Sequence, residues 1–274
     1  MNDLHVDPDW LATLRARAVQ PPRRPRQPLW AGASRIGSVE TDFIRKIDLQ
    51  PRQYLRKQLS KEERSGLVGW HVRGDVTTTL NELASAMHDA GLAGAWRDEQ
   101  LAVTDETGRR VGTVERAAVR PLGITTHAVH LAAQTAEGRH WVQQRAFNKS
   151  NDPGLWDTLM GGMVAAADTR ETALQRETWE EAGLHTVDLQ GLRYGGRFST
   201  SRPAVDGQGA GYVVEHIDWY RCTVPDALVP RNQDGEVEQF ALMDDAALIT
   251  AMARGAFTLE AALILAAVMG LGLV

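Results

Sequence analysis

The spacing of apolar residues predicts short helices and strands along the chain. From Leu80 to Ala90 the apolar side chains recur at intervals of three and four residues, as in a helix with one buried face. Two pairs of strand-like runs, 100–104 with 109–114 and 126–133 with 140–147, are each joined by a turn that contains glycine. We therefore expect an α+β protein with two hairpins.

The C-terminal part continues with strands and then helices. Residues 212–224 and 237–243 are rich in β-branched and aromatic side chains, which favours strands. Helices are expected over 244–253 and from Thr258 onward, where Thr258 is a suitable cap. The last apolar run, residues 261–274, is too short to span a bilayer as a helix, so we expect a buried C-terminal helix.

A segment rich in proline and arginine follows a short helix that is expected at about residues 10–18. Because proline removes a backbone donor and fixes φ, residues 20–28 are expected to form neither a helix nor a central strand. We interpret them as a solvated connection rather than as a polyproline ligand for a partner domain. The predicted organisation is an N-terminal extension (1–34), a small α+β domain (35–120) and a larger domain (121–274).

Composition and charge exclude some classes of function. Hydrophobic residues make up 43% and charged residues 24% of the 274, which is typical of a globular protein. The net charge of −5 argues against a general binder of nucleic acid or anionic membranes. Residues 1–60 hold 11 basic and 6 acidic side chains (+5), which leaves 19 and 29 (−10) for the remainder. A cation would bind in that acidic remainder.

Cysteine usage and the first residues indicate the compartment. Cys222 is the single cysteine, which excludes an internal disulfide and a zinc site built from cysteines. The first ten residues contain three aspartates and no apolar run, unlike a secretory signal. We expect a cytoplasmic protein.

One helix carries the candidate chemistry. Asp168 and Glu171 are expected to cap a helix over about 169–182, and Gly183 suits the left-handed position that ends it. Glu177, Glu180 and Glu181 share an arc of about 100° on this helix. These carboxylates repel one another, with no lysine beside them in sequence, and a divalent cation would remove that cost.

Hard oxygen donors without histidine or thiolate favour Mg²⁺, with Mn²⁺ as a substitute. An isolated Glu-x-x-Glu-Glu is more often a solvated acidic face than a metal site. The spacing of the surrounding residues is therefore needed to choose between the two interpretations. Gly162, five intervening residues, the acid Asp168, seven further residues and then Arg176-Glu177-x-x-Glu180-Glu181-x-Gly183-Leu184 resemble the Nudix box. The departures are Asp168, where the family has Glu, and Thr178, where an aliphatic residue is usual.

The resemblance implies a Nudix-type α/β/α sandwich preceded by a small α+β domain. It assigns the metal to Glu177, Glu180, Glu181 and the carbonyl of Gly162, and implies cleavage of a P–O bond in a small-molecule diphosphate. The catalytic base would be Glu177 or Glu236.

Arg145 and Lys149 precede the box and suit phosphate binding, with Arg197 a weaker candidate. Arg176 is expected to be structural, because it projects away from the carboxylates and needs its own acidic partner.

Further motifs resemble one Nudix branch with an extra N-terminal domain, some members of which are fused to thiamine pyrophosphokinase. These motifs include Trp96-Arg-Asp-Glu99, Leu122-Gly-Ile124, Pro153-Gly-Leu-Trp-Asp157, Asp234-Gly-Glu-Val-Glu238 and Gly255-Ala-Phe-Thr258. The branch implies hydrolysis of thiamine diphosphate or its oxidised analogues to the monophosphate. Trp96, Trp156 and Trp219 could stack on such a ring or belong to the core.

Three alternatives stay open. The first is a pyrophosphatase for nucleotide sugars or nucleoside diphosphates, and the second is a noncatalytic sensor that binds a diphosphate. The third, isomerisation of a prenyl diphosphate, would need a thiol or another acid, and Cys222 lies in a predicted strand. No nucleic-acid or membrane partner is expected. The oligomeric state, a homodimer included, is left open.

Overall fold

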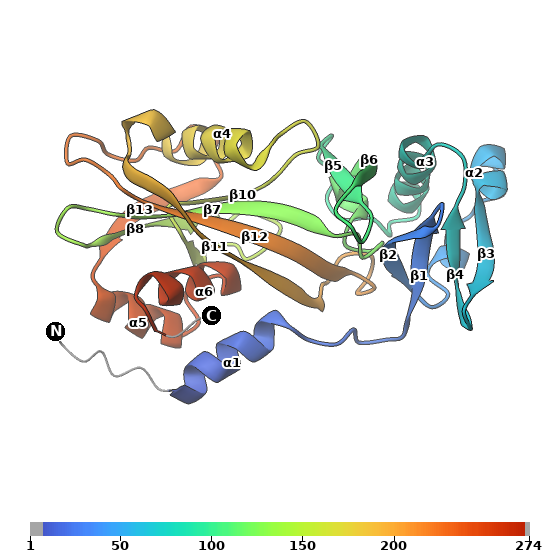
Figure 1. Ribbon diagram of the computed structural model, residues 1–274, viewed down its shortest axis with the longest axis horizontal. Coiled ribbons are helices and arrows are strands. Elements are labelled where there is room, and N and C mark those ends of the chain that lie inside the picture. Colours follow the sequence, from blue (N-terminus) through green and yellow to red (C-terminus); the bar gives the residue numbers. More distant parts are fainter. Residues whose placement is uncertain (1–7, 272–274) are drawn as a thin grey trace.

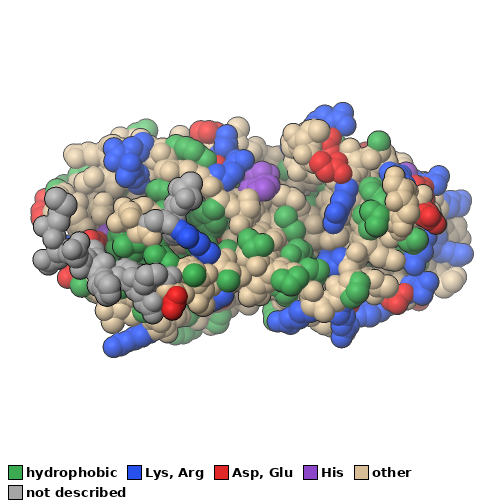
Figure 2. Space-filling view, turned by 60° about the horizontal axis from the view of Figure 1, so that its bottom comes forward, with side chains coloured by type: hydrophobic (Ala, Val, Ile, Leu, Met, Phe, Trp, Pro, Cys, Tyr) green, Lys and Arg blue, Asp and Glu red, His purple; other side chains and the backbone are tan. Residues whose placement is uncertain are grey.

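The computed structural model describes residues 8–271, which form a small N-terminal unit beside a larger sandwich (Figure 1). Figure 2 shows Lys and Arg side chains gathered around the N-terminal unit, in line with the basic balance of the first sixty residues. The N-terminal unit contains a four-stranded sheet in the order β2-β1-β4-β3. The strands are β1 (Arg26–Ala31), β2 (Ser34–Glu40), β3 (Leu59–Arg64) and β4 (Leu67–Val72).

Strand β1 corrects two expectations. It lies within the segment 1–34, so the sheet begins before residue 35, and it carries Pro28 into an inner strand. Pro28 is tolerated because β1 pairs with β2 from Arg26 onward but with β4 only from Leu29. On the β4 side, Pro28 therefore needs no backbone donor.

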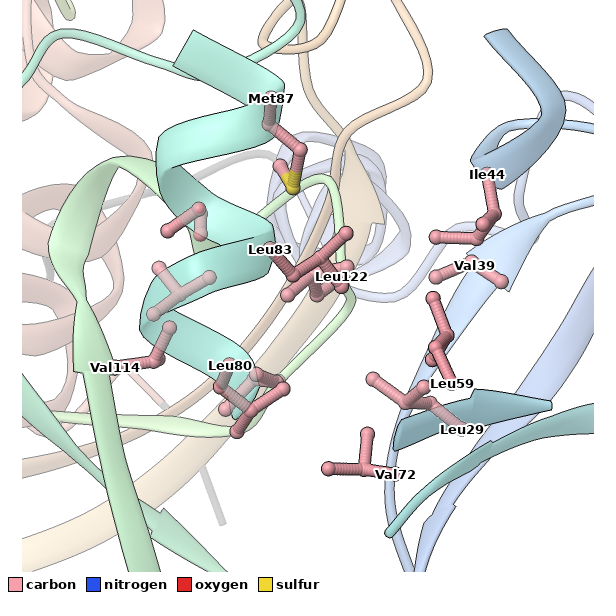
Figure 3. Packing of buried hydrophobic residues seen from close by; sticks show 14 of the residues in the cluster. Leu29, Val39, Ile44, Leu59, Val72, Leu80, Leu83, Met87, Val114 and Leu122 are labelled. Atoms are coloured by element: carbon pink, nitrogen blue, oxygen red, sulfur yellow. The ribbon is translucent and has the colours of Figure 1, made fainter. Parts of the chain in front are cut away.

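The core of this unit lies between the sheet and α3 (Val76–Asp89), which Asp75 caps. Leu80, Leu83 and Met87 from α3 are fully buried and face side chains of the sheet such as Leu29 and Val39 (Figure 3). Burial of each such side chain stabilises the fold by about 1.5–3 kcal/mol. The helix predicted from the apolar spacing is thus present.

Short elements complete the N-terminal unit. The predicted first hairpin is present as β5 and β6 and is followed directly by a 3-10 turn, η2. The bounds are η1 (Ile44–Lys46), α2 (Gln53–Gln58), β5 (Gln100–Thr104), β6 (Arg110–Glu115) and η2 (Arg116–Ala118).

The larger unit is built on a seven-stranded sheet with the path β11-β12-β7-β8-β13, to which β10 and β9 are added. The second predicted hairpin and the two predicted C-terminal strands are present, whereas β11 has no counterpart among the predictions. The strands are β7 (Thr126–Gln134), β8 (His140–Arg145), β9 (Trp156–Asp157), β10 (Met160–Met163), β11 (Gln190–Pro203), β12 (Tyr212–Thr223) and β13 (Val237–Met243).

Strands β7 and β8 diverge after two residue pairs, Ala133 with Trp141 and Gln134 with His140. Beyond that point β10 pairs with β7 and β9 pairs with β8. The divergence places two short strands, and the loop that follows β8, at the centre of the sheet.

Helices cover both faces of this sheet (Figure 1). Helix α4 (Arg170–Ala182) packs on one face, while α5 (Asp245–Ala253), α6 (Leu259–Val268) and α1 (Pro8–Ala18) lie on the other. This is the expected α/β/α arrangement, with α1 added through its contact with α6. The turn η3 (Thr186–Asp188) follows α4.

The two predicted C-terminal helices are present as α5 and α6, and Thr258 caps α6. The last three residues of the C-terminal apolar run, 272–274, and the aspartates at positions 3 and 7 lie outside the described residues. Within residues 8–271, no helix combines the length and apolar character that a membrane crossing requires.

Candidate active site

Helix α4 is fixed at both ends by local interactions. Thr169, not Asp168, is the N-cap: it accepts a hydrogen bond from the Thr172 backbone, and Thr172 returns the bond. Asp168 instead binds Arg176, whose long side chain reaches it across two turns. Gly183 ends the helix at φ +62°, as the sequence indicated.

Glu181 is the most buried acid of the box, with 1% of the residue exposed. Its Oε2 accepts hydrogen bonds from Gln143 Nε2 at 2.7 Å and from the Gly161 backbone at 3.0 Å. Its Oε1 lies 3.7 Å from Lys149 Nζ. No lysine is close to Glu181 in sequence, but Lys149 in the β8–β9 loop places its positive charge beside this carboxylate.

Glu177 lies against the backbone of Gly162. A Cβ atom added at Gly162 would stand 2.0 Å from Glu177 Cδ, so a larger residue would displace the carboxylate. Glycine at this position creates the space that Glu177 occupies.

Burial is the main cause of a raised pKa at both acids. Burial and the charge of Glu181 raise the pKa of Glu177 to about 8. Burial raises the pKa of Glu181 to about 7, although Lys149 and the Gly161 hydrogen bond oppose the rise. Two carboxylates that are costly to ionise, beside the Gly162 backbone, form a set of hard oxygen donors that fits a divalent cation.

Arg176 departs from expectation. It was expected to project away from the carboxylates, but its Nη1 lies 2.9 Å from both Glu177 and Glu180, and its Nη2 lies 2.9 Å from Asp168. The acidic partner that the sequence required is therefore present together with two box glutamates.

This pairing turns Glu180 toward Arg176. Within the described residues, no three His, Cys, Asp or Glu side chains converge as they stand into a metal-binding group. Arg176 thus holds one oxygen of each of two acids that the resemblance assigns to the metal, Glu177 and Glu180.

A cavity of about 130 Å³ opens in front of Glu177 and Glu181. Apart from Glu180 and the weaker candidate Arg197, its lining contains the predicted metal, base and phosphate residues, namely Gly162, Glu177, Glu181, Glu236, Arg145 and Lys149. Lys149 bonds Glu236, and Arg145 Nη1 lies 3.4 Å from Asp157. The fold therefore brings together side chains from β8, the loops beside it, β10 and α4.

Glu236 is held by cations. Burial would raise its pKa, but the hydrogen bond and charge of Lys149, and the charges of Arg116 and Arg97, hold the pKa below its usual value. Glu236 is consequently a weaker proton acceptor than Glu177.

The sequence did not identify several further residues of the cavity wall. They come from strands, loops, the turn η2 and helix α6, which are distant from one another in sequence. These residues are Arg116, Arg120, His130, Asn151, Asp157, Arg202, Glu215 and Glu260. Two of them lay in motifs of the branch resemblance, Arg116 in Val114-Glu-Arg116 and Asp157 in Pro153–Asp157. Arg202 and Glu260, paired at 3.0 Å, come from β11 and α6 and share no local pattern.

Other candidates lie elsewhere. Arg197 binds the buried Asp218 at 2.7 Å and is not part of this cavity wall. Burial raises the pKa of Cys222 to about 12, and Cys222 belongs to the core beneath α4. Trp96, Trp156 and Trp219 do not line the cavity either.

Comparison with known proteins agrees with this geometry. The NUDIX domain model matches residues 125–262. An uncharacterized Nudix hydrolase of Pseudomonas aeruginosa is 33% identical over 105 residues, covering 38% of this chain and 60% of that protein. Nudix hydrolase 20, chloroplastic, of Arabidopsis thaliana is 26% identical, covering 67% of this chain and 49% of that protein.

These matches span about half to three-fifths of the relatives' own lengths. Among solved structures, the crystal structure of DR0079 from Deinococcus radiodurans is 21% identical with a TM-score of 0.47, covering 58% of this chain and 92% of that chain. The family match spans the seven-stranded sheet, the box helix and the predicted site residues, and the chain belongs to the Nudix family.

Proposed function

We propose that the protein is a Mg²⁺-dependent pyrophosphohydrolase that cleaves the diphosphate linkage of a small molecule. The observation that carries this proposal is the pair of buried carboxylates, Glu177 and Glu181, that share one cavity with Arg145 and Lys149. Acids that are costly to ionise attract a divalent cation, and the basic side chains beside them attract phosphate.

The chain's own residues take separate roles. Glu177, Glu180, Glu181 and the Gly162 carbonyl would hold Mg²⁺ or Mn²⁺, which would neutralise phosphate charge and orient a water for attack at phosphorus. Arg145 and Lys149 hold the phosphate oxygens in place. Glu177 is favoured over Glu236 as the base that takes the water proton, because Lys149 already binds Glu236.

For the substrate, we infer from the branch resemblance thiamine diphosphate or one of its oxidised analogues. The three candidate tryptophans lie outside the cavity wall, so the structure adds no ring-stacking support. A nucleotide sugar or nucleoside diphosphate is the alternative substrate. A noncatalytic diphosphate sensor is the alternative function, which the complete set of box glutamates disfavours.

The third alternative function is isomerisation of a prenyl diphosphate. Isopentenyl-diphosphate Delta-isomerase of Serratia proteamaculans is 28% identical to this chain over 120 residues. The core position of Cys222 removes the one thiol that could protonate carbon.

The test is product release with Mg²⁺ from a panel of thiamine diphosphate, its oxidised analogues, ADP-ribose, nucleotide sugars and nucleoside triphosphates. Preferred turnover of the thiamine compounds supports the substrate proposal. Preferred turnover of nucleotides replaces it while leaving the hydrolase intact. Tight binding of a compound without turnover of any compound contradicts the hydrolase proposal and supports the sensor.

A further inference from the structure

A second cavity, of about 280 Å³, adjoins the first at the junction of the two units. Four residues line both cavities, namely Arg116, Arg120, Asn151 and Met163. Arg116 begins η2 of the N-terminal unit, and Arg120 follows that turn. The two arginines therefore stand where a molecule that extends from the box glutamates toward the N-terminal unit must pass.

Each of these guanidinium groups is only partly engaged by the described residues. Arg116 Nη1 donates to Glu99 Oε2 at 2.7 Å. Arg120 Nη1 donates to Asn151 Oδ1 at 2.8 Å and to Asp206 Oδ2 at 3.3 Å. Because guanidinium has five N–H donors, both groups keep donors for a further acceptor.

Two further arginines that line the first cavity, Arg145 and Arg202, also hold unused donors. The Nε atoms of Arg145 and Arg202 are buried and have no hydrogen-bond partner among the described residues. Buried donors without partners are rare in folded proteins, so an acceptor that enters the cavity would satisfy them. An anion is the acceptor that guanidinium groups bind best.

Positive charge from the N-terminal unit also lies near Glu236, in the wall of the first cavity. Arg116 and Arg97 both act on the Glu236 carboxylate, although they belong to the N-terminal unit and Glu236 precedes β13. Arg97 also lines the second cavity, where its Nη2 lies 3.2 Å from Ser150 Oγ. Positive charge from the N-terminal unit thus reaches the cavity of the box glutamates.

We propose that Arg116 and Arg120 bind the phosphate of the substrate diphosphate that is not attacked, so that both units form the substrate site. The attacked phosphate lies at the box glutamates, and the group attached to the second phosphate enters the second cavity. This assignment rests on the proposed function for the identity of the ligand, and it gives the N-terminal unit a role in substrate selection.

The test is calorimetric binding of methylenediphosphonate, a diphosphate analogue whose bridging carbon resists hydrolysis, in the presence of Mg²⁺. Arg116→Gln and Arg120→Gln should each weaken its binding about 10- to 100-fold, as expected for loss of a charged hydrogen bond. Inorganic phosphate, which fills one subsite only, should bind the variants within about threefold of wild type. Arg110→Gln is the control, since exposed Arg110 lies in the same unit but outside both cavities.

Equal affinities for methylenediphosphonate in Arg116→Gln, Arg120→Gln and Arg110→Gln would overturn the proposal, as would absence of binding to wild type. If Arg120→Gln does not fold, Arg116→Gln decides, because the Arg116 side chain is 38% exposed and hydrogen-bonds one side chain, Glu99, within residues 8–271. Failure of the proposed function would look different: wild type and variants would then turn over no diphosphate, yet the analogue would still bind more weakly to the variants.

Discussion

At the scale of single residues, the site depends on small clearances and on burial. Gly162 leaves room for Glu177, and Gln143 with the Gly161 backbone fixes one oxygen of Glu181. The contacts that position these acids also remove them from water. The metal-free protein therefore carries an electrostatic cost that a bound cation would relieve.

This cost predicts a pH dependence of stability in chelator. The pKa of Glu177 is raised to about 8 and that of Glu181 to about 7, whereas both lie near 4.5 in the unfolded chain. The folded protein therefore binds more protons between pH 4.5 and 8, and the free energy of unfolding falls as pH rises through that window. Taken together, the two shifts predict a loss on the order of 6 kcal/mol between pH 5 and pH 8.5, measured by urea denaturation.

Glu177→Gln should raise the free energy of unfolding at pH 8.5 in chelator and flatten the pH profile. Saturating Mg²⁺ should flatten the profile of the wild type but leave the variant nearly unchanged. A wild-type profile in chelator that rises with pH would contradict the assigned cost.

At the scale of elements, α4 is the part that the sequence predicted best. Its limits agree because a capping residue and a left-handed glycine are local signals. The identity of the cap was wrong, because Asp168 is drawn to Arg176 and Thr169 then meets Thr172. The helical pattern alone does not show that Asp168 binds Arg176, eight residues later, instead of capping the helix.

Thr169→Ala should remove the N-cap and lower the free energy of unfolding by about 1 kcal/mol. The matched control is Thr250→Ala in α5, where an exposed threonine lies within the helix and alanine is the better helix former. The control should be neutral or slightly more stable in the same urea experiment. Equal destabilisation of both variants would exclude the capping role.

At the scale of the whole molecule, the sequence predicted most strands of the sandwich but not how distant segments meet. Strand β11 was missed because its glycines and half-exposed charges give no clear alternation. Arg202 on β11 and Glu260 on α6 reach the cavity only through the packing of the sheet. The sequence therefore identified the acids and two of the cations, Arg145 and Lys149, and the fold added Arg116, Arg120 and Arg202 to the cavity wall.

The central claim is that the buried box glutamates serve diphosphate hydrolysis rather than stability. The most direct measurement is the Mg²⁺-dependent rate of diphosphate cleavage by wild type, Glu181→Gln and Glu238→Gln, with the fold of each checked by circular dichroism. Glu238 is an exposed acid on β13 and makes the same change of charge outside the cavity. We expect at least a 100-fold loss in folded Glu181→Gln and wild-type rates in Glu238→Gln, since removal of one group that stabilises the transition state electrostatically costs about 10²–10³ in rate. Full activity of Glu181→Gln, or full wild-type activity in chelator, would contradict it.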